Sequence, residues 1–233
     1  MKKAAAKVLL AFVVVTFLEA AVQKSEDLNK DLRAAIIFGK IDEAKRLIEA
    51  GVDVNKRFNL RASRNITPLY LAVMSGQADI GKLLIESGAD VNIEYDGVNL
   101  LHVAALYRGN KAVAELLIAK GLDVNAKCAA HGKAKDTTPL HAAAGKGNIA
   151  VAEELIKNGA ELDAKVFENH YTPLHVAARN NKNAVAELLI AKGAEVNAMT
   201  KHRETSLDLA ISNGNEELAD LLRKHGGISG ESR

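Results

Sequence analysis

A histidine beside a glycine-rich loop is the first feature of this sequence that suggests chemistry. His141 precedes Gly145-Lys146-Gly147 in the stretch TPLHAAAGKGN, residues 138–148. Such a loop next to a catalytic base could cradle a phosphate group. A P-loop, however, needs a glycine five residues before its glycine-lysine pair, and a serine or threonine directly after it. Here those places hold Leu140 and Gly147. The sequence therefore favours a turn between two helices over a phosphate site.

A cysteine and two histidines form the second candidate site. Cys128, His131 and His141 could suggest a metal site or an activated nucleophile. They are accompanied by neither a second cysteine nor a carboxylate at ligand spacing. We therefore expect no catalytic residue, no metal and no cofactor. A role for Cys128 as a reactive surface thiol stays open.

The first 23 residues differ from the rest of the chain. Three lysines precede an apolar run of residues 8–18, and Ala20 and Ala21 follow it. This is the layout of a secretory signal peptide. As a helix, the run would span about 16 Å, well short of the roughly 30 Å of a hydrocarbon core. We expect export to the periplasm or the medium, with an uncleaved membrane anchor as the alternative.

Composition limits the class of partner. The chain is 48% hydrophobic and 26% charged, which is ordinary for a folded domain, and its net charge is +2. Residues 1–22 contain three lysines and one glutamate, so the rest of the chain has equal numbers of basic and acidic residues. A neutral domain gives no reason to expect nucleic-acid binding.

A repeated pattern organises the remainder of the chain. The threonine-proline pairs Thr67-Pro68, Thr138-Pro139 and Thr172-Pro173 each open a unit. Threonine caps a helix N-terminus, and proline is tolerated at the first helical position because the N–H it lacks has no partner there. A glycine in a left-handed C-cap is expected to end each unit's second helix. These glycines are Gly51, Gly88, Gly121, Gly159, Gly193 and Gly226.

The pattern TPLHxAA followed by GNxxVAExLIxxGAxVN closely resembles ankyrin repeats. The resemblance covers about residues 28–226 and implies an all-α solenoid of stacked helix-turn-helix units with β-hairpin-like fingers. It also implies that His102, His141 and His175 tie loop backbone groups together, and that the chain is a protein-binding module without enzymatic activity. We divide the chain into a leader (1–23), a repeat domain (24–226) and a polar tail (227–233). The units expected in the domain are 28–55, 65–92, 97–125, 136–163, 170–197 and 203–226.

The finger loops are candidate contacts. The residue two before each cap should have a positive φ angle, and glycine, asparagine and aspartate suit that position better than arginine does. These residues are Asn65, Gly97, Asp136, His170 and Arg203. Basic residues on the first and third fingers could grip an acidic patch of a partner, or could simply be solvated. The candidates are Arg57, Arg61, Arg64 and Lys133.

Residues before the turn between helices should face the concave groove in this family. Those with types enriched at interfaces or with a positive charge are Phe38, Met74, Tyr107, Lys146 and Arg179. Phe38 and Tyr107 could instead pack locally. We predict an exported, monomeric module that binds a protein through its concave face and fingers. A membrane-tethered scaffold is the alternative.

Overall fold

A computed structural model describes residues 23, 25–60, 63–95, 97–107, 110–129, 135–166 and 168–232, with the backbone alone for residues 60, 63, 64 and 232. Residues 1–22 and most of the predicted leader therefore lie outside the described residues, as do Arg61, His131 and Lys133.

Helices follow one another in antiparallel pairs joined by short turns. The first pair is the helix of residues 25–37, which begins before the expected start of the first unit at residue 28, and α2 (Ile41–Glu49). The pairs that follow are α3 (Pro68–Met74) with α4 (Ala78–Glu86), α5 (Leu100–Leu106) with α6 (Lys111–Ala119), α7 (Pro139–Lys146) with α8 (Ile149–Lys157), α9 (Pro173–Arg179) with α10 (Asn183–Ala191), and α11 (Ser206–Ser212) with α12 (Glu216–Lys224).

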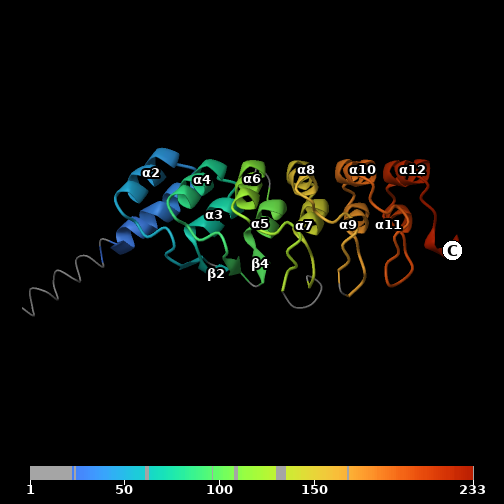
Figure 1. Ribbon diagram of the computed structural model, residues 1–233, viewed down its shortest axis with the longest axis horizontal. Coiled ribbons are helices and arrows are strands. Elements are labelled where there is room, and N and C mark those ends of the chain that lie inside the picture. The colour runs from blue at the N-terminus through green and yellow to red at the C-terminus, as the bar shows by residue number, and fades with distance from the viewer. Residues whose placement is uncertain are drawn as a thin grey trace, which may run out of the picture.

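The pairs stack side by side into an elongated molecule with two rows of helices (Figure 1). The outer row contains α2, α4, α6, α8, α10 and α12, and the inner row contains the helix of residues 25–37 with α3, α5, α7, α9 and α11. Among α2 to α12, each helix packs against a neighbour in its own row, and the two helices of each pair from α3–α4 onward pack together. Such a stack is held together by nearest-neighbour contacts.

Fingers project from the inner row on the side opposite the outer row (Figure 1). The first is a hairpin of β1 (Phe58–Leu60) and β2 (Ser63–Ile66), with Phe58 paired to Ile66. The second pairs β3 (Glu94–Tyr95) with β4 (Val98–Asn99). A short 3₁₀ turn, η2 (Gly230–Ser232), lies near the C-terminus.

The core is built from leucine and alanine. Leu140 in the inner row and Leu155 in the outer row are fully buried, and Ala143 and Ala144 of inner helix α7 are equally inaccessible. Each buried leucine contributes about 1.5–3 kcal/mol relative to an exposed one. The small alanine side chains let neighbouring inner helices approach closely, which compensates for the scarcity of aromatic residues.

Backbone conformation follows the turn chemistry that the sequence predicts. All five finger positions expected to have positive φ do so, from His170 at 57° to Gly97 at 75°. Arg203 is among them at 62°, although its side chain is poorly suited to that conformation. The glycines that end the outer helices are also left-handed, with Gly159 at 88°.

Asparagines that open the fingers link each unit to the next. The Asn125 amide donates to the Gly159 carbonyl at 3.0 Å, and its Oδ1 accepts the Glu161 N–H at 2.8 Å. Asn55 makes the same two contacts with Gly88 and Asp90, and Asn197 makes them with Gly226 and Ile228. These pairs satisfy carbonyl and N–H groups at helix ends, which would otherwise lack partners.

No helix in the described part of the chain is long and apolar enough to cross a membrane.

Candidate protein-binding surface

One position of each inner helix contacts the segment that follows its unit, which is a finger in the first five units and the tail in the sixth. The position comes directly after a fully or almost fully buried leucine and faces that segment. Its occupants are Arg33, Tyr70, His102, His141, His175 and Asp208.

His141 shows how a histidine works at this position. The Thr138 N–H donates to its Nδ1 at 3.2 Å, so the proton is on Nε2, which donates to the Tyr171 carbonyl at 3.0 Å. Burial lowers the pKa of His141 to about 4, against the opposing effect of backbone carbonyls. The ring is therefore neutral at physiological pH and is fully engaged by backbone groups.

The two other histidines occupy equivalent places. His102 Nε2 lies 2.9 Å from the Thr137 carbonyl, and burial lowers the pKa of this ring. The Thr172 N–H donates to His175 Nδ1 at 3.2 Å, and burial lowers the pKa of His175 to about 4. Their surroundings are those of structural residues.

Aromatic contacts replace the histidine in the first two units. The Arg33 guanidinium lies 5.2 Å from the centre of the Phe58 ring in the first finger. The Tyr70 and Tyr95 rings lie 5.4 Å apart across the second. In these two units, a cation–π contact and a tilted ring contact thus join the inner helix to its finger, as hydrogen bonds from histidine do in the middle of the array.

Cys128 is buried, with 2% of its surface exposed, so the reading of it as a reactive surface thiol is wrong. Its N–H donates to the Thr137 carbonyl at 2.8 Å and its carbonyl accepts the Asp136 N–H at 3.0 Å. This pairing closes the base of the third finger and holds the thiol out of solvent. Within the described residues, no group of three or more histidine, cysteine or acidic side chains could hold a metal ion.

The ends of the inner helices expose the side chains expected at a binding surface. Phe38 is 72% exposed and Tyr107 is 40% exposed, so neither is hidden by local packing. Met74 differs, because it is half-buried against the core. Lys146 and Arg179 are both exposed.

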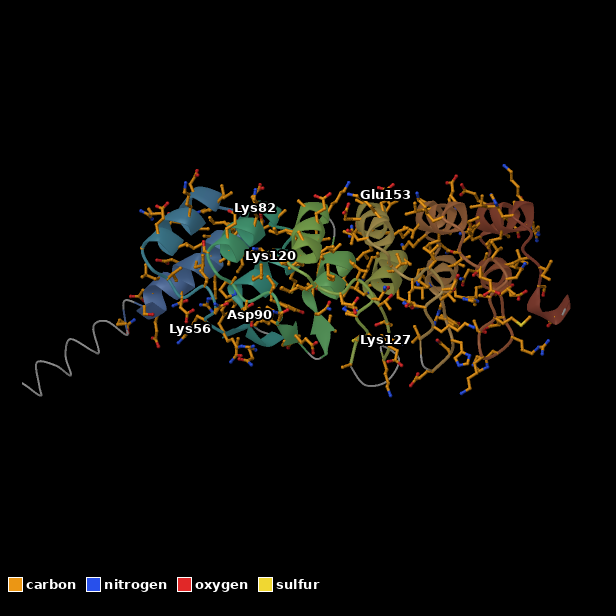
Figure 2. All side chains as sticks on the ribbon, in the orientation of Figure 1. Lys56, Lys82, Asp90, Lys120, Lys127 and Glu153 are labelled. Carbon is orange, nitrogen blue, oxygen red and sulfur yellow. The ribbon has the colours of Figure 1, made fainter. Side chains whose placement is uncertain are left out.

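Some finger residues carry positive charge on the side of the inner row that faces away from the outer row. Figure 2 shows the side chains of Lys56 and Lys127 on the finger side and that of Glu153 at the outer row. Arg57 is exposed on the first finger and reaches the Asn65 carbonyl at 3.4 Å. Arg64 belongs to β2, and its side chain is outside the described part of the structure.

Comparison with protein families decides the identity of the fold. Residues 32–128 and 140–232 match the family described as ankyrin repeats (3 copies). The chain belongs to the ankyrin repeat family. Its ankyrin fold is similar to the crystal structure of the human ASB11 ankyrin repeat domain, with 27% identity, a TM-score of 0.72, and 84% of each chain covered. No curated protein sequence matches the chain.

Sequence reasoning missed part of this ankyrin surface. It did not identify Arg33, Tyr70 or Tyr171 as contacts between helices and fingers. A signal was present for the first two, because each follows a leucine that aligns with the leucine before His141. Tyr171 has no such signal, because the contacts of its ring with Arg179 and His175 depend on the folded arrangement of the finger and the helix.

Proposed function

We propose that this ankyrin array is a non-catalytic module of six repeats that binds a protein partner through its concave face and finger loops. The observation that carries the proposal is the exposure of Phe38 and Tyr107 at the ends of the inner helices. Large aromatic side chains are enriched at interfaces and supply much of their binding energy. Ankyrin repeats in general are protein–protein interaction modules.

A rigid surface supports this proposal. The inner helices pack tightly through alanine, and the fourth finger is held to them by His141, whose Nε2 donates to the Tyr171 carbonyl. Little conformational freedom is lost when such a surface binds, which favours affinity. The module functions as a monomer that needs no metal or cofactor, and light scattering of the purified protein measures its mass directly.

We propose that the protein is exported, because residues 1–23 have the layout of a signal peptide. Cleavage near Ala21 would release the array into the periplasm or the medium. An intact Met1 in membrane fractions would support the tethered scaffold instead. Mass spectrometry of the N-terminus in the native host distinguishes the two.

The binding surface is tested by capture with cross-linking and mass spectrometry from the compartment where the protein resides. Residues 24–233 are compared with a Phe38→Ala, Tyr107→Ala double variant. The control is Ile149→Ala, which removes an apolar side chain that is 40% exposed on outer helix α8. We expect a partner to be captured by the wild type and the control and lost by the double variant. Equal capture by all three would contradict binding through the ends of the inner helices.

A further inference from the structure

Charges are divided unequally between the two helix rows. The stretches of sequence that include inner helices α3, α5, α7 and α9, residues 67–77, 99–110, 138–148 and 172–182, contain no aspartate or glutamate. Their basic residues are Arg108, Lys146, Arg179 and Lys182. The charge of the inner row in these four units therefore has one sign, although the domain as a whole is neutral.

The outer row carries charges of both signs, and three of its lysines pair with a glutamate of the same helix. Lys82 pairs with Glu86 on α4, Lys111 with Glu115 on α6, and Lys157 with Glu154 on α8. Lys146, Arg179 and Lys182, by contrast, form no ion pair with any described carboxylate. Those three side chains, which we call the cationic strip, present uncompensated charge.

The strip is continuous across two units. Gly147 has a φ of 71°, and a β-carbon on it would lie 2.9 Å from Cδ of Lys182. The aliphatic part of Lys182 from the fifth unit therefore crosses the turn of the fourth, directly after Lys146. A glycine at this turn leaves the space that this side chain fills.

Arg179 is held by its neighbours. Its guanidinium lies 5.6 Å from the centre of the Tyr171 ring, and the same ring stacks on His175 at 5.7 Å. A guanidinium ordered in this way loses less freedom when it binds a carboxylate, and it can bind in a bidentate manner. The Tyr171 ring is engaged by these two contacts, so it is a poor platform for stacking a nucleic-acid base.

We infer that the cationic strip binds an acidic segment of the partner protein, with Arg179 as its anchor. This inference rests on the proposed function and names the chemistry of the partner. The fingers below carry both signs, for example Lys165 with Glu168, so they do not extend the strip. The attraction is therefore localised on the fourth and fifth units.

Fluorescence anisotropy of a labelled peptide of alternating glutamate and glycine tests the inference. Wild-type residues 24–233 are compared with a Lys146→Glu, Arg179→Glu, Lys182→Glu variant. The control is a Lys45→Glu, Lys120→Glu, Lys192→Glu variant, which has the same net charge. It reverses the charge of three exposed lysines that lie in the outer helices or directly after them. Circular dichroism first establishes that all three proteins are folded.

We expect the inner-row variant to weaken peptide binding by about tenfold or more, with the control near wild type and all binding reduced by added salt. Equal weakening by both variants would show generic attraction and overturn the inference, as would the absence of peptide binding. Tighter binding of an oligothymidylate of matched charge would also overturn it. If the captured partner is insensitive to the inner-row variant but depends on Phe38 and Tyr107, the inference fails and the proposed function stands.

Discussion

The carboxylate of Asp208 accepts a hydrogen bond from the backbone N–H of Gly230 at 2.8 Å. Asp208 occupies the place at which His141 donates to a carbonyl of the next finger. Residues 227–232 follow the sixth unit here, and Gly230 presents an N–H group to this position, so an acceptor is required where His141 has a donor. The Thr205 hydroxyl adds a bond to the Ile228 carbonyl at 2.9 Å. The tail is thus fixed to the inner helix of the sixth unit.

Displacing the tail should destabilise the last unit. A β-carbon on Gly230 would collide with the Arg203 carbonyl oxygen, so Gly230→Ala should force the tail away. Asp208→Ala should have a similar effect, since it leaves the Gly230 and Thr205 N–H groups without their acceptor. We expect a loss of roughly 1–3 kcal/mol in the free energy of unfolding for Asp208→Ala, measured in urea. Glu231→Ala, on the exposed part of the tail, serves as the control, and a Gly230→Ala protein as stable as this control would contradict the contact.

Buried histidines predict loss of stability in mild acid. The pKa of His141 and of His175 is about 4 in the folded chain and about 6.5 when unfolded. Between these values the unfolded chain binds more protons, so stability falls as the pH drops from about 6.5 to 4. For His141 the effect is of the order of 3 kcal/mol. Urea unfolding across this range should show a shallower slope for His141→Gln than for wild type. Parallel slopes would show that this ring titrates normally.

An acidic residue on α8 lies at a leucine position. Glu154 is 6% exposed and precedes Leu155, whereas Leu83, Leu116, Leu188 and Leu221 precede the equivalent buried leucines. Glu154→Leu should restore apolar packing and raise stability by about 0.5–2 kcal/mol. Thermal unfolding provides the measurement, with Glu153→Leu on the exposed neighbouring position as control. A lower melting temperature for Glu154→Leu would mean that its contacts with Lys157 and Asn158 stabilise the fold.

Backbone strain is expected at one finger. Arg203 has a φ of 62°, a conformation that costs most residues about 1–2 kcal/mol. Arg203→Gly should therefore raise the urea midpoint. Lys201→Gly, in the same finger but outside the left-handed positions, should lower it through chain entropy. If both substitutions lower the midpoint equally, the strain is absent.

The local features of the fold were predictable because they depend on nearby residues. Threonine-proline pairs, the glycines that end the outer helices and the left-handed finger positions follow from cap and turn chemistry within a few residues. Contacts between units were not predictable in this way. Arg33 reaches Phe58, and Gly230 reaches Asp208, only because the chain folds back onto itself. Burial of Cys128 likewise depends on its pairing with Thr137.

Hydrogen exchange of the complex with its captured partner tests most directly that the concave face is the binding surface. The account predicts slower exchange at the ends of the inner helices and in the fingers, including the backbone at Phe38 and Tyr107, with little change in the outer row. Protection confined to the outer helices, or no protection at all, would contradict it.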